Sequence, residues 1–123
     1  MPNNHLTLVI EDTPRPGLKT VALVGSLSLE TVANFNQSLR EEPEQVLILN
    51  LEKLEWLDSA GVGSLVQLLV RREKTGKKLA LTSLSVRNNA VLQVAQVLKI
   101  FPVFQTLAEA HTHFGKANAS SGA

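Results

Sequence analysis

Hydrophobic and polar positions follow two different spacings along this chain of 123 residues, and the spacing changes several times. Short apolar runs bounded by turn-forming residues predict strands over 5–12, 19–28, 45–51 and 78–84. The run at 45–51, QVLILNL, is the most apolar of them, which is expected of a central parallel strand. A shorter run at 102–107 favours a fifth strand.

Between these runs the apolar residues recur every three or four positions, which is the spacing of an amphipathic helix. A first helix is predicted after the second strand, with Val32, Phe35 and Leu39 on its buried face. A longer helix is predicted over 59–74, and Gly76 ends it beside a basic segment that suits the negative end of a helix dipole. The buried face of this longer helix is expected to consist of Val62, Leu65, Val66 and Leu69.

Two further helices are predicted towards the end of the chain. One covers 88–100, with Asn88 or Asn89 as its N-cap, and a short one covers 108–114. Strands and helices alternate after an opening hairpin, and this order indicates an α/β fold. We therefore predict a single domain over 1–116, with a mixed sheet of four to five strands packed against about four helices.

Composition narrows the class of protein. A hydrophobic content of 44% and a charged content of 19% indicate a soluble globular domain, and the polar segment 117–123 is expected to be a disordered tail. The net charge of +1 does not favour direct binding to nucleic acid or to an anionic membrane. No cysteine is present, so disulfides and thiolate metal sites are excluded. The sequence shows no secretion signal and no apolar stretch long enough to insert into a membrane, so we expect a cytoplasmic protein.

Catalytic motifs are incomplete throughout the sequence. Leu57 stands two residues before Ser59, where the hydrolase elbow has a glycine, and Val66 interrupts a dinucleotide-binding pattern after Gly61 and Gly63. His111 and His113 are two residues apart, a poor spacing for a metal pair on one helix. We therefore expect no enzymatic activity, no cofactor and no metal.

The segment EWLDSAGVGSL, over 55–65, carries the strongest functional signal. Asp58 and Ser59 stand where a helix begins, and either residue is a favoured N-cap. Capping does not explain Gly61 and Gly63, because a glycine inside a helix costs about 1 kcal/mol relative to alanine. Together with Ala60, these glycines remove side-chain bulk from the first turn, which suggests a docking surface with a modifiable hydroxyl in it.

The segment LILNLEKLEWLDSAGVGSLVQLLVRREKTGKKLALTSL, with its Asp-Ser-small-Gly-hydrophobic-Gly motif, resembles the core of the STAS domain. The resemblance extends over nearly the whole chain and is closest to the anti-sigma factor antagonists of that family. It implies a non-enzymatic protein whose serine is phosphorylated by its partner, an anti-sigma factor with serine kinase activity. Unphosphorylated, such a protein binds the anti-sigma factor and releases a sigma factor, and a serine phosphatase restores this form.

Carried over position by position, the resemblance makes Ser59 the phosphorylation site and Asp58 a neighbour that shapes recognition by the kinase. Ala60, Gly61 and Gly63 are then the clearance for the partner.

Two positions depart from the family pattern: Ser28 and Asn50 stand where the family commonly has aspartates, so a partner-contacting acid is replaced at Ser28. An alternative role is a constitutive STAS subunit of a transport or stress-signalling complex.

Overall fold

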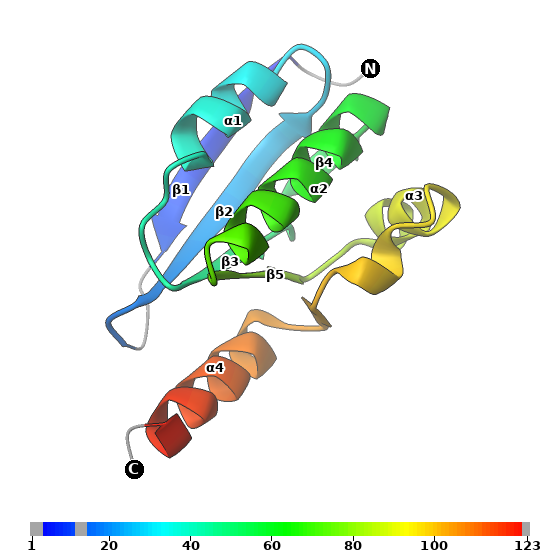
Figure 1. Ribbon diagram of the computed structural model, residues 1–123. Coiled ribbons are helices and arrows are strands. Elements are labelled where there is room, and N and C mark those ends of the chain that lie inside the picture. Colours follow the sequence, from blue (N-terminus) through cyan, green and yellow to red (C-terminus); the bar gives the residue numbers. More distant parts are fainter. Residues whose placement is uncertain (1–3, 12–14, 122–123) are drawn as a thin grey trace.

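A computed structural model of the chain describes residues 4–11 and 15–121 (Figure 1). The described residues form six strands: β1 (Leu6–Glu11), β2 (Leu18–Leu27), β3 (Val46–Asn50), β4 (Leu54–Leu57), β5 (Lys78–Thr82) and β6 (Val103–Phe104). They also form four α-helices and one 3-10 helix: α1 (Val32–Leu39), α2 (Ser59–Lys74), α3 (Val86–Val94), η1 (Leu98–Ile100) and α4 (Leu107–Ser121). The predicted alternation of strands and helices is confirmed, and the predicted bounds of α2 are those observed.

The strands build one mixed sheet. Its order is β1-β2-β3-β5-β6, with β1 antiparallel to β2 and the other neighbouring pairs parallel. β3 is central and all five of its residues are buried, as its continuous apolar run predicts. The predicted α/β domain with a mixed sheet and an opening hairpin is therefore confirmed.

Strand β4 was not predicted, and it positions the motif. β2 is long enough to pair with two strands in succession: its first half pairs with β3, and 25–27 pair in parallel with β4. The register shifts at Gly25, whose φ of +112° is a conformation that glycine adopts readily. Because β4 has only four residues, of which Glu55 is exposed and Trp56 is half-buried, its sequence carries little strand periodicity.

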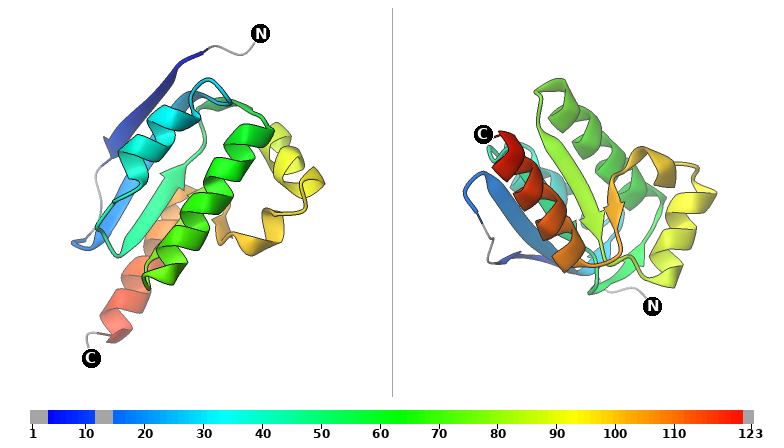
Figure 2. Two further views of the ribbon diagram at one scale, coloured as in Figure 1. Left: turned by 45° about the horizontal axis from the view of Figure 1, so that its top comes forward. Right: turned by 90° about the horizontal axis from the view of Figure 1, so that it is seen from below.

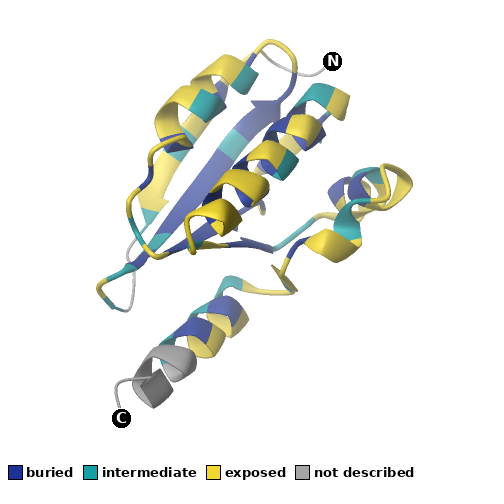
Figure 3. Ribbon diagram, in the orientation of Figure 1, coloured by how far each residue is buried: buried dark blue, intermediate teal, exposed yellow. Residues whose placement is uncertain are grey.

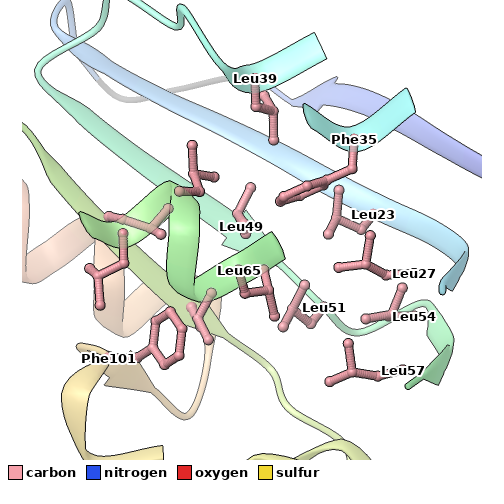
Figure 4. Close-up of a cluster of buried hydrophobic side chains, with 14 of the residues drawn as sticks. Leu23, Leu27, Phe35, Leu39, Leu49, Leu51, Leu54, Leu57, Leu65 and Phe101 are labelled. Carbon is pink, nitrogen blue, oxygen red and sulfur yellow. The ribbon is translucent and has the colours of Figure 1, made fainter. Parts of the chain in front are cut away.

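Helices cover the two faces of the sheet unequally. α1 and α2 lie side by side on one face, while α4 lies on the other (Figures 1 and 2). The larger core forms between the sheet and α1 and α2, and Figure 4 shows Leu49 and Leu65 between the sheet strands and α2. A smaller core forms where Ala110 and Phe114 of α4 contact Ile48 and Ala80.

The start of α3 corrects the predicted cap. Ser85 is the N-cap, and its hydroxyl accepts a hydrogen bond from the N–H of Asn88 at 3.0 Å. Asn88 lies inside the helix and is fully buried, with its side-chain amide donating to the carbonyl of Leu54 at 3.0 Å. Asn88 therefore ties α3 to β4, which is a packing role that its preference for helix caps does not reveal.

The final helix is longer than the predicted 108–114. Its backbone runs to Ser121, so the segment expected as a tail, 117–123, falls partly on α4 and partly outside the described residues. The domain bounds 1–116 and the disorder of that tail stay predictions.

Candidate functional site

Asp58 closes the junction between β4 and α2. It is the N-cap of α2: one carboxylate oxygen accepts a hydrogen bond from the N–H of Gly61 at 2.9 Å. The other oxygen accepts from the N–H of Leu29, in the loop after β2, at 3.1 Å. A third bond joins the N–H of Asp58 to the carbonyl of Leu27 at 3.3 Å. Asp58 therefore fastens the first turn of α2 to the end of β2, in addition to any role in recognition.

Gly61 is required by the packing of the domain itself. It is buried, and a Cβ built on it would lie 2.3 Å from the carbonyl oxygen of Leu27 and 2.9 Å from a methyl carbon of Leu57. The nearer group is backbone, which cannot move aside at little cost, and the methyl carbon belongs to Leu57, which is itself buried in the core. The expectation that Gly61 leaves room for a partner is thus wrong, because the room is taken by the chain's own β2.

The outer side of the same turn is open. Ser59 and Gly63 are exposed and Ala60 is partly exposed. A Cβ on Gly63 would meet nothing within 4 Å. Ser59, Ala60 and Gly63 together form a surface with little side-chain bulk, as the sequence predicted for this turn.

The loop after β2 lies beside this surface and differs from the prediction. Ser28 is only 2% exposed, so its side chain is not presented to a partner. Its hydroxyl donates to the carboxylate of Glu30 at 3.0 Å, and Glu30 is exposed. An acidic group is therefore present in this loop, two residues after the position where the family pattern places it.

Asn50, the second departure, has a structural role. Its side-chain amide donates to the carboxylate of Glu11 at 3.1 Å, and its side-chain oxygen accepts from the N–H of Glu52 at 3.1 Å. These bonds fix the turn between β3 and β4 and tie it to β1. An aspartate at this position would place a second carboxylate beside Glu11, and the asparagine avoids this repulsion.

An apolar groove runs between α2 and α3, and we call it the α2–α3 groove. It is lined by Ser59, Val62, Arg87, Ala90, Val91, Val94 and Ala95. Figure 2 (left) shows α3 beside one end of α2, and the groove residues identify that end as the first turn. Val94, one of the lining residues, is 82% exposed. Leu29, in the loop that is hydrogen-bonded to Asp58, is 70% exposed. Figure 3 shows that α2 itself has buried residues on the side towards the sheet and exposed residues on its outer side.

Two groove features were missed by the sequence analysis. The guanidinium of Arg87 lies over the ring of Trp56, 4.2 Å from its centroid. The two residues are far apart in sequence, and no spacing rule connects them. The exposed valines of α3 were also missed, because the apolar spacing predicted an amphipathic helix with its apolar residues buried, whereas Val86 and Val94 are exposed.

The opposite end of α2 holds the domain's buried charges. Arg72 is buried and donates to three backbone carbonyls, those of Glu42, Glu44 and Lys78. Desolvation by burial lowers the pKa of Arg72, against the attraction of Glu42. Burial also opposes ionisation of Glu42, but hydrogen bonds from Lys19 and from the N–H of Glu44 outweigh it and lower its pKa. This cluster stabilises the fold and lies away from the motif.

No group of three or more potential metal ligands occurs within residues 4–11 and 15–121. Over the same ranges, none of the helices combines the length and the apolar character needed to cross a bilayer.

Comparison with known proteins gives a consistent result. The sequence model of the STAS domain matches residues 9–110. Among solved structures, an anti-sigma factor antagonist from Mycobacterium paratuberculosis superposes with a TM-score of 0.76 at 21% identity, covering 89% of this chain and 94% of that one.

Two further structures have the same fold. The unphosphorylated form of the anti-sigma factor antagonist SpoIIAA gives a TM-score of 0.69 at 21% identity and covers 89% of this chain and 97% of that one. The STAS domain of a SulP transporter from Vibrio cholerae gives 0.68 at 20% identity, with 88% of each chain covered. At these identities the likeness shows the fold, which antagonists and transporter domains share.

Proposed function

The chain belongs to the STAS domain family, and on that premise we propose that it is an anti-sigma factor antagonist switched by phosphorylation of Ser59. Unphosphorylated, it binds an anti-sigma factor with serine kinase activity and so releases a sigma factor. A serine phosphatase reverses the modification. The protein acts as a binding module without catalysis of its own, in the cytoplasm where its partners and ATP are found.

The exposure of Ser59 beside a fixed Asp58 is the observation that carries this proposal. Ser59 is exposed at the first position of α2, where a kinase can reach its hydroxyl. Ser26, Ser28 and Ser64 are buried, and the hydroxyl of Ser85 is engaged in capping α3. The N-terminus of α2 also tolerates added negative charge, because free N–H groups and the helix dipole favour it.

The proposed modification is a phosphoryl transfer. A bond forms between Oγ of Ser59 and the γ-phosphorus of ATP, while the bond from that phosphorus to the bridging β-oxygen breaks and ADP leaves. The hydroxyl proton passes to a base of the kinase. In the reverse step, water attacks the phosphorus and inorganic phosphate leaves, restoring the hydroxyl.

The switch acts on docking without unfolding the domain. Phosphorylation adds about two negative charges at pH 7. At Ser59 these charges lie next to Asp58 and on the rim of the apolar α2–α3 groove. A partner that buries this groove would have to desolvate the phosphate as well, so affinity falls.

A constitutive STAS subunit is the second candidate. It is favoured by the likeness to the STAS domain of a SulP transporter, which is nearly as close as the likeness to SpoIIAA. In that role the α2–α3 groove would bind its partner whether or not Ser59 is modified.

The test incubates the protein with ATP and the candidate kinase, followed by intact mass measurement, phosphopeptide mapping and a binding titration. We expect one phosphate, on Ser59, and no phosphate on Ser59→Ala. Ser59→Ala should bind the anti-sigma factor continuously and Ser59→Asp weakly, both with near-normal melting temperatures. Ser38→Asp is the matched control, since Ser38 is exposed on α1 and outside the groove. Ser59→Asp binding as tightly as the parent would reject the switch and favour the constitutive subunit.

A further inference from the structure

Arg87 occupies a position that the motif alone does not explain. Its side chain is exposed, and its guanidinium rests on the half-buried ring of Trp56 at 4.2 Å. Among the described residues, no carboxylate forms a salt bridge with it. Its neighbour Asn88 is anchored to the carbonyl of Leu54, so the backbone that carries Arg87 is fixed relative to β4.

Ser59 and Arg87 line the same groove from its two sides. Ser59 comes from the first turn of α2 and Arg87 from the first turn of α3. Arg87 is the one charged side chain among the described residues that line the groove. A cation that forms no salt bridge with any described carboxylate therefore shares an apolar surface with the hydroxyl that is proposed to become a dianion.

We propose that Arg87 is the receptor for the phosphate on Ser59, and that phosphorylation draws its guanidinium away from Trp56. This inference rests on the proposed function, since it assigns the intramolecular partner of the phosphorylated serine. An arginine forms a bidentate, charge-assisted pair with a phosphate, and such a pair is stronger than an exposed contact between a cation and an aromatic ring. The exchange is therefore favourable, and it leaves the ring of Trp56 more accessible to solvent.

The exchange changes the shape of the docking surface as well as its charge. An Arg87–phosphate pair would join α3 to α2 across the α2–α3 groove, whose lining also includes the apolar Val62 and Val91. A partner would then have to break this pair before it could contact the apolar floor. In the phosphorylated state the groove is thus covered by this pair. The carboxylate of Ser59→Asp reproduces the effect only in part, because it has less charge than a phosphate.

The test uses phosphoserine incorporated genetically at position 59, so that it does not depend on finding the kinase. Trp56 is the only tryptophan, and its emission reports on this site alone. We expect acrylamide to quench Trp56 more strongly in the phosphorylated protein than in the parent. In Arg87→Gln the quenching should already be high, and phosphoserine should not change it. Arg71→Gln is the matched control, because Arg71 is exposed near the far end of α2.

A phosphorus NMR titration examines the pair directly. The second pKa of the phosphate should be lower in the phosphorylated parent and in phosphorylated Arg71→Gln than in phosphorylated Arg87→Gln, and Arg87→Lys should lie between them. Equal titration in all four proteins, or unchanged quenching of Trp56, would overturn the assignment of Arg87. Because the phosphate is installed without a kinase, these results leave the proposed function untouched, which fails only if Ser59 is not modified or does not control binding.

Discussion

The inner and outer sides of the first turn of α2 have different tasks, although they share one short motif. On the inner side, Gly61 lies against the carbonyl of Leu27 and Asp58 is bonded to two backbone N–H groups. On the outer side, Ser59 and Gly63 face solvent. Successive residues of a helix are rotated by about 100°, so two glycines separated by one residue point in nearly opposite directions.

This comparison shows that a motif is not a uniform functional surface. Gly61 lets the chain approach itself, whereas Gly63 leaves space that another molecule can use. The inner residues place the outer ones, since a shift of α2 away from β2 would also displace Ser59. Substitutions on the two sides should therefore separate stability from binding.

The largest effect is expected deep on the inner side. Leu65 is fully buried in the main core, and Leu65→Ala should lower the free energy of unfolding by roughly 2–5 kcal/mol through the lost contacts and the cavity left behind. A urea titration measures this change. A loss below about 0.5 kcal/mol, the range of surface substitutions, would mean that the inner face has been assigned wrongly.

Gly61→Ala should have the next largest effect on stability. The added methyl would overlap the Leu27 carbonyl, and overpacking of this kind costs about 1–3 kcal/mol. If Gly61 instead left room for a partner, as the resemblance implied, alanine would keep or slightly raise the stability of the helix. Thermal melting decides between the two, and a melting temperature equal to the parent's would restore the earlier interpretation.

Asp58→Ala should destabilise less. Loss of an N-cap costs about 0.5–2 kcal/mol, and the bond to Leu29 is lost with it. Partner binding should fall beyond the loss of stability, because the loop that carries Leu29 is released beside Ser59. A denaturant titration and a binding titration on the same preparation check this, and normal binding would show that the loop is not part of the interface.

Gly63→Ala should have the smallest effect on stability, and in the opposite direction. Its surroundings are open, so alanine should stabilise the helix by up to about 1 kcal/mol. The same methyl enters the outer surface and should weaken binding of the anti-sigma factor. Gln67→Ala is a suitable control, since Gln67 is exposed one turn further along α2. Undiminished binding by Gly63→Ala would remove Gly63 from the docking surface.

Most of the fold could be predicted because its long elements have clear periodicity. The bounds of α2 and the burial of Val62, Leu65 and Leu69 follow from apolar spacing. β4 could not be predicted, because it has only four residues and these do not alternate regularly between buried and exposed positions. Its existence depends on pairing with β2, which is a contact distant in sequence.

The site residues show the same difference between features set by local sequence and features set by contacts distant in sequence. Ser59 and Asp58 could be placed because helix capping is local chemistry. The burial of Gly61 and Ser28 could not, because it depends on how β2 passes beneath α2. The contact of Arg87 with Trp56 also joins two separate elements, and only the folded chain reveals it.

The contact between α4 and β2 links folding to proton release. Nε2 of His111 lies 3.0 Å from the hydroxyl of Thr20, which is fully buried. Burial lowers the pKa of His111, although the nearby charge of Glu11 acts in the opposite direction. A histidine whose pKa is lower in the folded state stabilises the fold above the unfolded pKa of about 6.5, and this contribution is lost as the pH falls through the folded value. Mild acidification should therefore loosen the attachment of α4 first, and hydrogen exchange at Ala110 and Phe114 would record it as faster exchange at pH 5 than expected from the intrinsic rate.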